Sequence, residues 1–481
     1  MTLTPRAIFY IFLIIFVEGY IVLSTELLAI RILTPYVGSG TDTISIIIAA
    51  VLLPLAAGYY FGGKFTPSRL GKDYNRTIRR KLSHNILISS VFILLGLSFL
   101  SSAIFVQTII STLTHDRILV TSFYTFIFLV TPVFLLGQTT PLLSNFFSEQ
   151  KLSETTGKIL FISTLGSFIG ATFTTLILMS YIGVNHTVVV NVVLAVLLYT
   201  SLNKSTRIER TLIIAAGLVF VAYALNSQKV LDSFHIVESN KYNNIAVMTD
   251  PEDGMKMIIL NNTISSGIDK DGKSFPYIGY LEDNFINTIP DDRKPAHILV
   301  LGAGGFTLGL DDDINIYDFV DIDGSLKDVS EKYFLGHELG PNKHFHPIPA
   351  RGFLMQNTQK YDLILIDLFS SLQNIPEHLV TRDFFEQVKG ALQPDGFVTA
   401  NIIANPVYQD AFSRNIDATF RSVFPDINRQ IVSPGFNAWK TGDMANLLYS
   451  AKNTVTQEPH RIYTDNLNRS YTDRPRELNR S

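Results

Sequence analysis

The 481-residue sequence contains no cysteine, which excludes disulfide bonds, thiolate metal sites and a cysteine nucleophile. The net charge of −3 is small for a chain of this length and gives no indication of a nucleic-acid partner. Charged residues make up only 17% of the chain, whereas apolar residues make up 47%. A chain this apolar is not expected to be soluble throughout, and its length allows two or three domains.

Apolar residues are concentrated before about residue 228, in windows long enough to cross a bilayer as helices of roughly 20 residues. The first window is too long for a signal peptide and has no small-residue cleavage site, so we interpret it as a true span. Residues 1–228 are therefore expected to form a multi-span α-helical domain in the cell (inner) membrane, with the lipid bilayer as a partner. We predict seven spans, near 8–32, 43–63, 85–107, 119–138, 159–182, 187–203 and 210–227.

Basic residues in two loops indicate how the spans are oriented. Residues 64–81 carry many Lys and Arg side chains against one acid, Asp73, and Lys204, Arg207 and Arg210 precede the seventh span. Under the positive-inside rule both regions lie in the cytoplasm, as does the N-terminus. Seven spans then place the C-terminal half on the opposite side of the membrane.

The first span also contains the ionisable residues Glu18, Glu26 and Arg31. Such groups at membrane depth usually pair or face a polar cavity. Two interpretations are open: a polar pathway or binding cavity, or an Arg31 that reaches the membrane interface while Glu26 bonds a neighbouring helix.

From about residue 230, short apolar runs alternate with turns and helical periods. HIVESNKYNNIAVMTD, MKMIILNN, AHILVLGA, NIYDFVDID, YDLILIDL and GFVTANII predict strands, whereas DVSEKYFLG and TRDFFEQVKGAL predict helices. Thr381 is expected to cap the second helix, and Pro394 with Gly396 to end it. The pattern predicts an α/β Rossmann-like domain over 276–452, after a small β-hairpin subdomain at 229–275 and before a polar tail at 453–481.

The run HILVLG leads into Gly302, Gly304 and Gly305, and a short helix is expected next. About twenty residues later the following strand ends in Asp321 and Asp323. Glycines at such a turn let the backbone approach a ligand, and an acid at the next strand end can accept hydrogen bonds from ribose hydroxyls. The motif predicts a nucleoside-type ligand rather than a dinucleotide, because Thr307 occupies the last position of the GxGxxG pattern.

Asp367 follows YDLILI, at the carboxyl end of what should be a central strand, where open α/β sheets bind ligands. There it can act as a general base or orient an amine. The alternative is a cap for the following turn.

Taken in order, these motifs resemble the spermidine synthase family, and specifically its membrane-fused branch. The resemblance covers essentially the whole chain, because STELLAIRILTPYVGSG and the segment after it are similar to the opening helices of that branch. The motifs are ESNKYNNI, LNNTISS, SFPYIGYL, VLGAGGFT, VDID, PARGFL, YDLILIDLFS and YTDRPREL.

The resemblance implies a Rossmann-like fold of the class I methyltransferase type and a transferase that takes part in polyamine biosynthesis. The aminopropyl group would pass from decarboxylated S-adenosylmethionine to an amine, which is putrescine in the family, and leave methylthioadenosine. S-adenosylmethionine and methylthioadenosine are further candidate ligands, and a homo-oligomer is a candidate assembly. A co-substrate made in the cytoplasm favours a cytoplasmic domain, against the span count. By position, Asn243, Gly302, Gly304 and Asp321 would bind the co-substrate, Tyr277 the amine, and Asp367 would be catalytic.

The sequence departs from the family pattern where the family has acids or a histidine. The replacements are Ile278, Gly279, Gly305, Pro349 and Ser370. The missing carboxylates would hold a diamine cation, so we expect an acceptor other than putrescine.

Other residues carry weaker signals. Glu338, His344 and His346 are typical of a polar surface loop rather than a metal site, since no HExxH helix frames them. The run Asp311 to Asp313 is expected to be a solvated loop or cap, with attraction of a polyamine as the alternative. Three other functions stay open: a polyamine or small-cation transporter or sensor with a noncatalytic nucleoside-binding domain, a noncatalytic scaffold, and a methyltransferase.

Overall fold

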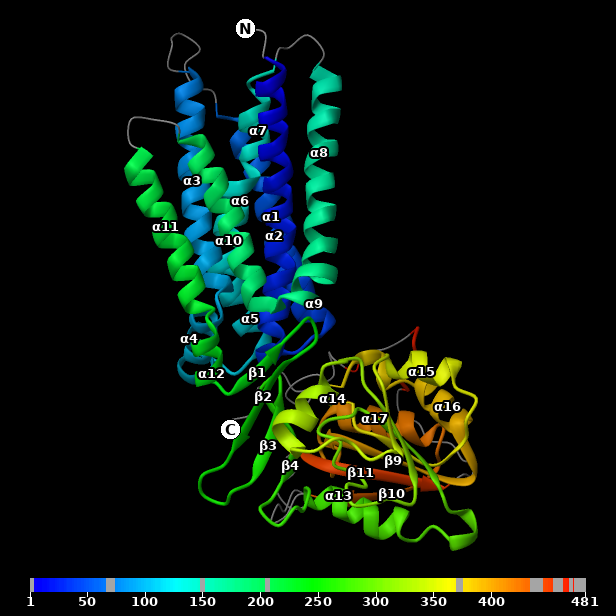
Figure 1. Cartoon of the computed structure of the whole chain (residues 1–481). Helices are drawn as coiled ribbons and strands as arrows, with labels where there is room; N and C mark the ends of the chain where they lie inside the picture. Colours follow the sequence, from blue (N-terminus) through cyan, green and yellow to red (C-terminus); the bar gives the residue numbers. More distant parts are fainter. Residues whose placement is uncertain are drawn as a thin grey trace.

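A computed structural model describes residues 4–65, 74–147, 152–203, 208–368, 375–432, 444–452, 462–466 and 470. Ser370, the motif YTDRPREL and most of the predicted tail lie outside these residues. A bundle of helices forms the first half of the chain, and the C-terminal half lies against one end of that bundle (Figure 1). The N-terminus lies at the other end.

Within the described residues, seven helices are long and apolar enough to cross a membrane, in agreement with the predicted number of spans. Segments η1 and η2 are π-helical and continue the helices before them. The helices are α1 (Pro5–Val37), α2 (Thr41–Gly63), α3 (Tyr74–Leu97), α4 (Phe99–Thr112), α5 (Arg117–Thr125), η1 (Phe126–Val130), α6 (Thr131–Gly137), α7 (Thr139–Ser144), α8 (Leu152–Phe173), η2 (Thr174–Leu178), α9 (Met179–Tyr181), α10 (Gly183–Leu202), α11 (Ile208–Leu225) and α12 (Gln228–Ser233).

The predicted third span, 85–107, is wrong in its position. The membrane-length helix covers Asn75–Leu97, and the chain breaks at Ser98 before the shorter helix α4. Ser98 has an extended backbone, with φ −70° and ψ 137°, and its hydroxyl accepts a hydrogen bond from Asn226 Nδ2 at 2.9 Å. Asn226 Oδ1 also accepts a hydrogen bond from the backbone N–H of Phe99, at 3.0 Å, and so provides a partner for a backbone group at the start of α4. An apolar window alone does not reveal this contact.

Glycines bring α1 and α8 into close contact. A Cβ atom at Gly166 would overlap the carbonyl oxygen of Phe16, and one at Gly170 would overlap that of Tyr20. Small residues allow such close packing between membrane helices, where van der Waals contact is a main source of stability. The first helix is therefore held firmly in the bundle.

A four-stranded antiparallel sheet follows the bundle, with the order β1-β2-β3-β4. It is larger than the expected hairpin, because the first predicted strand folds back on itself as β1 and β2, and because β4 was not predicted. Asn240 Oδ1 accepts hydrogen bonds from the backbone N–H groups of Tyr242 and Asn243, and an Asn side chain that bonds the backbone in this way favours a turn. The strands are β1 (Ile236–Ser239), β2 (Asn244–Thr249), β3 (Lys256–Leu260) and β4 (Thr263–Ile268).

A seven-stranded sheet forms the centre of the C-terminal half, with the order β10-β11-β9-β8-β5-β6-β7. Strands β5 to β9 pair in parallel, whereas β11 runs antiparallel to β9 and β10. This parallel core confirms the predicted Rossmann-like fold. The strands are β5 (His297–Leu301), β6 (Ile316–Val320), β7 (Lys343–His346), β8 (Tyr361–Ile366), β9 (Leu392–Ala404), β10 (Asp426–Ile431) and β11 (Ala445–Lys452).

Helices cover both faces of this sheet, because side chains along each strand alternate between the faces. On β5, Leu299 and Leu301 pack with α15, α16 and α17, whereas Ile298 and Val300 pack with α13, η3 and α14. The helices are α13 (Pro276–Leu281), η3 (Glu282–Ile286), η4 (Asp291–Arg293), α14 (Leu326–Val329), η5 (Ser330–Leu335), α15 (Ala350–Gln356), η6 (Glu377–Leu379), α16 (Arg382–Ala391) and α17 (Ala411–Arg421).

Three local predictions in this half are wrong. No helix follows the glycine turn, because Gly302, Gly304, Phe306 and Gly309 have positive φ, which a right-handed helix does not accommodate. Thr381 caps α16 as predicted, but the helix ends at Ala391, and Pro394 and Gly396 lie inside β9 because Leu392 is already extended. His344 and His346 lie in strand β7, paired with β6, and not in a loop.

The bundle contacts the C-terminal half mainly through the four-stranded sheet. The guanidinium of Arg31, in the C-terminal part of α1, donates to the Asn240 carbonyl oxygen at 2.8 Å and to Asn244 Oδ1 at 3.0 Å. Asn262 Nδ2 donates to the Pro35 carbonyl oxygen at 3.3 Å. Arg31 therefore joins α1 to the four-stranded sheet, a contact that neither interpretation of the charged first span included.

Candidate functional site

The candidate site lies where β5, β6 and β8 end. These strands are neighbours and parallel, so Gly302, Asp321 and Asp367, which directly follow them, meet at one edge of the sheet. The backbone N–H of Gly302 donates to Val320 O, and that of Asp367 to Leu301 O, both at 2.8 Å. This edge opens into a cavity of about 690 Å³. All six residues predicted for the site line it: Asn243, Tyr277, Gly302, Gly304, Asp321 and Asp367.

The glycine turn forms one wall of the cavity, and its backbone requires glycine. Gly302 has φ +96°, and a Cβ atom there would overlap the carbonyl oxygen of Asp367. Gly304 has φ +52°, and its Cβ would lie 2.9 Å from Ser266 Oγ. The turn is held in place by a hydrogen bond from Gly305 N to Ser266 Oγ, at 2.9 Å. The bare backbone of this turn is therefore exposed to the cavity.

Asp321 is tied to the glycine turn. Its carboxylate accepts hydrogen bonds from the backbone N–H groups of Ala303, at 3.1 Å, and Asp323, at 3.0 Å. Burial raises the pKa of Asp321 to about 6, although these backbone N–H groups act in the opposite direction. Each carboxylate oxygen has further lone pairs, so Asp321 can accept hydrogen bonds from a ligand's hydroxyl groups.

Asn243 lines the cavity, but both ends of its amide are bonded to protein groups. Its Nδ2 donates to Asp323 Oδ2 at 2.8 Å, and its Oδ1 accepts from Asn261 Nδ2 at 2.8 Å. Asn240 Nδ2 donates to the same carboxylate, at 2.9 and 3.1 Å. Asp323 thus joins the four-stranded sheet to the strand end that carries Asp321, and Asn243 shapes the cavity instead of contacting Asp321.

Asp367 is oriented by two neutral side chains. Tyr277 Oη donates to one carboxylate oxygen at 2.9 Å, and Asn401 Nδ2 donates to the other at 3.1 Å. Burial raises the pKa of Asp367 to about 6, while both hydrogen bonds act to lower it. Burial and the neighbouring carboxylate raise the pKa of Tyr277 well above its ordinary value. Tyr277 therefore remains a hydrogen-bond donor at neutral pH.

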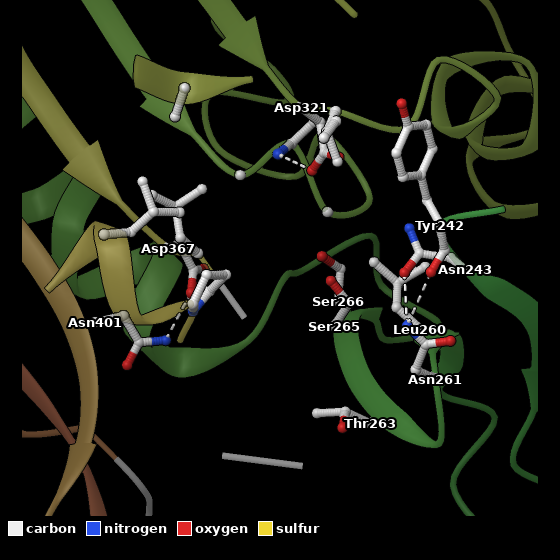
Figure 2. A pocket seen from close by; sticks show the side chains of 18 of the residues that line it. Tyr242, Asn243, Leu260, Asn261, Thr263, Ser265, Ser266, Asp321, Asp367 and Asn401 are labelled. Carbon is white, nitrogen blue, oxygen red and sulfur yellow. Dashed lines mark hydrogen bonds between the residues drawn. The ribbon is translucent and has the colours of Figure 1, made fainter. Parts of the chain in front are cut away.

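Asn401 was not predicted from the sequence. It lies in β9 and is only 5% exposed, and its Oδ1 has no hydrogen-bond partner among the described residues. Figure 2 shows Asn401 beside Asp367 on one side of the pocket, with Asn243 and Asn261 on the other. Because Oδ1 is closed off from the cavity, the contribution of Asn401 to the site is its Nδ2 group, which orients the Asp367 carboxylate.

Few charged side chains line the cavity. Among the described residues, the carboxylates are Asp321 and Asp367, and the basic side chains are Arg31, Lys241 and His378. In the same part of the chain, no group of three or more His, Asp or Glu side chains is placed to hold a metal ion. His346 Nε2 instead contacts Asp318 Oδ1 at 2.7 Å.

Comparison with known proteins finds a family match in the C-terminal half of the chain. The family model described as "Spermine/spermidine synthase domain" matches residues 285–437, a range that includes the glycine turn, Asp321, Asp367 and Asn401. The C-terminal half contains a spermine/spermidine synthase domain. The synthase domain and the seven apolar helices agree with the predicted membrane-fused branch.

Two curated relatives are polyamine aminopropyltransferases. The protein from Vibrio vulnificus (strain CMCP6) is 34% identical over 139 residues, which are 27% of this chain and 44% of that protein. The match thus spans less than half of that relative. The protein from Oceanobacillus iheyensis is 22% identical over 448 residues, 84% of each chain. Among solved structures, a probable spermidine synthase from Corynebacterium glutamicum is 22% identical, with a TM-score of 0.38, over 45% of this chain and 78% of that chain.

The positions at which the synthase domain departs from the family pattern differ in their surroundings. A Cβ atom at Gly305 would lie 2.5 Å from the Phe334 ring, so packing leaves no room for an acid there. Around Gly279, in contrast, a Cβ atom would meet nothing within 4 Å. Ile278 and Pro349 line the cavity with apolar surface. Where the resemblance predicts acids or a histidine, the structure thus has closed packing at Gly305, open space at Gly279, and an apolar wall at Ile278 and Pro349.

Proposed function

We propose that this protein is a membrane-anchored aminopropyltransferase that uses decarboxylated S-adenosylmethionine and an amine acceptor. The observation that carries the proposal is the position of Asp367, which lies in one cavity with Asp321 and the glycine turn and is bonded to Tyr277 and Asn401. Membership of the synthase family and similarity to polyamine aminopropyltransferases support this assignment.

The residues at the strand ends fit the nucleoside part of such a co-substrate. Gly302 and Gly304 let the ligand approach the backbone, and the lone pairs of Asp321 suit ribose hydroxyls. The segment after β7 lies beside these residues, because β7 pairs in parallel with β6. From it, Pro349 and Ala350 line the cavity with apolar surface, which suits the flat face of a base.

Asp367 would prepare the acceptor for transfer. A protonated amine has no lone pair for attack, so the carboxylate of Asp367 accepts a proton from it, while Tyr277 and Asn401 hold that carboxylate in place. The nitrogen then forms a bond to the aminopropyl carbon next to the sulfonium. The carbon–sulfur bond breaks, the sulfur keeps the electron pair, and neutral methylthioadenosine leaves. Since the sulfonium is already a good leaving group, positioning contributes most of the catalysis.

The test is transfer of a labelled aminopropyl group by the purified full-length protein to a panel of amines. We expect release of methylthioadenosine in step with labelling of the amine. Asp367→Asn should reduce the rate by about 10²–10⁴-fold, the range typical of a lost general base. Asp313→Asn, at an exposed aspartate outside the cavity, is the matched control and should retain full activity. Equal rates for wild type and Asp367→Asn would contradict the assignment.

The buried carboxylates of α1 favour a second candidate, a polyamine or small-cation transporter or sensor. Glu18 and Glu26 are buried in the bundle, and Glu18 Oε2 has no hydrogen-bond partner among the described residues. Uptake of labelled putrescine into liposomes that contain the full-length protein tests this function. Uptake that is lost in Glu18→Gln would support a transporter, and the absence of uptake by wild type would exclude transport of putrescine.

A further inference from the structure

The cavity is closed on one side by the membrane bundle. Leu27, Ile30 and Thr34 of α1 line it, together with Thr175 of η2 and Met179 of α9. These residues lie in the same cavity as Asp367 and the glycine turn, although they precede the synthase domain by more than a hundred residues. The bundle therefore forms part of the site's wall in addition to anchoring the domain.

This wall is formed by the C-terminal part of α1. The helix has 33 residues and is about 50 Å long, whereas the hydrocarbon core is about 30 Å thick, so roughly 20 Å of α1 extends beyond it. Leu27 lies about 15 Å before the end of the helix at Val37. The cavity thus runs along the last turns of α1, and if the excess length lies at this end the cavity is level with the lipid headgroups.

The π-helical segment η2 is part of the same wall. Thr175 and Met179 line the cavity, whereas Leu176 and Ile177, between them, are exposed apolar side chains. A π-helical turn changes the direction of the side chains that follow it, and such turns occur frequently at functional sites. The segment thus presents one side to the cavity and apolar side chains to the surroundings of the bundle.

The acceptor part of the cavity suits one amine and an apolar chain. Asp321 is bonded to the glycine turn, so Asp367 is the carboxylate near which both the reacting amine and the ammonium of the transferred aminopropyl group can lie. A second ammonium, as in a diamine, would find no further carboxylate among the described lining residues and would instead meet Arg31 and Lys241. An unpaired charge in such a place is costly. Apolar side chains line the cavity between Asp367 and the bundle: Leu27, Ile30, Met179, Leu260, Ile264 and Leu368.

We propose that the acceptor is a primary amine carried on an apolar chain that partitions into the bilayer and reaches Asp367 along the wall formed by α1 and α9. This inference rests on the proposed aminopropyl transfer and specifies its second substrate. In the reaction, the amine gives one proton to Asp367 and its nitrogen bonds to the aminopropyl carbon. The carbon–sulfur bond breaks with its electron pair on sulfur, and the positive charge passes from sulfur to nitrogen, so the product is a secondary ammonium that stays in the membrane.

The test uses full-length protein in nanodiscs of phosphatidylcholine, supplied with decarboxylated S-adenosylmethionine. Three acceptors are compared: putrescine, dodecylamine, and phosphatidylethanolamine included in the disc. We expect kcat/KM for dodecylamine to exceed that for putrescine by roughly tenfold or more. Turnover of phosphatidylethanolamine alone would identify a lipid headgroup as the amine, and turnover of dodecylamine alone a free long-chain amine; either supports the inference.

A pair of isoleucine variants tests the apolar wall. Ile264 is 51% exposed and lines the cavity, whereas Ile314 is 62% exposed and lies outside it. Ile264→Asp places an anion in the acceptor path, so it should lower kcat/KM for the long-chain amine by roughly tenfold and raise that for putrescine. Ile314→Asp should change neither. Both positions are exposed, so both variants should fold.

The outcomes separate this inference from the proposed function, with calorimetric binding of methylthioadenosine as the second readout. A wild-type protein that prefers putrescine overturns the inference and leaves aminopropyl transfer in place. Binding of methylthioadenosine without transfer to any of the amines also overturns the inference. Neither binding nor transfer overturns both proposals together. An equal effect of Ile264→Asp and Ile314→Asp would contradict the role of the wall.

Discussion

Asp367 is half-buried and bonded to two neutral donors, and its pKa of about 6 predicts the pH dependence of the reaction. The carboxylate must be ionised to take a proton, so kcat/KM should rise as pH increases through about 6. The Tyr277 hydroxyl stabilises the ionised form, and Tyr277→Phe should therefore move this inflection to higher pH. Rate measurements from pH 5 to 9 on both proteins test this, and an unchanged inflection in Tyr277→Phe would contradict it.

Some site residues could be predicted from sequence because their positions follow a general rule. Gly302, Asp321 and Asp367 directly follow apolar strands, and parallel strands bring such positions together. Asn401 could not be predicted, because an Asn inside an apolar strand gives no sign of which group it contacts. The bonds of Arg31 to Asn240 and Asn244 join residues more than two hundred positions apart, and no local pattern indicates them.

The glycine turn is the element most sensitive to substitution. Gly302→Ala would strain a positive φ and also push a methyl group into the Asp367 carbonyl, so we expect destabilisation on the order of 1–3 kcal/mol and weaker co-substrate binding. Gly272 has a similar φ of +83° with nothing within 4 Å of a Cβ atom, so Gly272→Ala measures the backbone strain alone. Thermal unfolding of both variants tests this. Equal losses of stability in the two variants would show that the overlap with the Asp367 carbonyl contributes nothing.

At the level of elements, apolar periodicity predicted the number of spans and the parallel sheet, because both depend on long buried runs. Apolar periodicity failed where a few residues determine the local backbone conformation. The turn at Asn240 divides one predicted strand into β1 and β2, and positive φ values replace the helix expected after Gly304. The break at Ser98 depends on Asn226, a residue in another part of the bundle.

Charge at the two ends of the bundle predicts the orientation of the whole molecule. Basic side chains at the helix ends far from the synthase domain are Arg6, Arg76, Arg79, Arg80, Lys81 and Arg210, and Figure 1 shows these ends together with the N-terminus. The positive-inside rule places this end in the cytoplasm and the synthase domain on the other side. The need for a co-substrate made in the cytoplasm favours the reverse.

Reporter fusions decide the orientation. From the charges we expect alkaline phosphatase joined at Ser481 to be active, and the same reporter joined after Leu202, at the basic end, to be inactive. The reverse pattern would place the synthase domain in the cytoplasm and show that the basic helix ends do not set the topology.

The central claim is that the cavity beside the glycine turn holds the decarboxylated co-substrate. Calorimetric binding of the full-length protein to decarboxylated S-adenosylmethionine, S-adenosylmethionine and methylthioadenosine tests it most directly. We expect micromolar binding that prefers the decarboxylated ligand over S-adenosylmethionine, because Asp367 would repel the extra carboxylate. Asp321→Asn should weaken this binding by roughly tenfold, the effect of about one lost hydrogen bond to a charged group. Absence of binding to all three ligands, by protein that unfolds cooperatively on heating, would contradict the account.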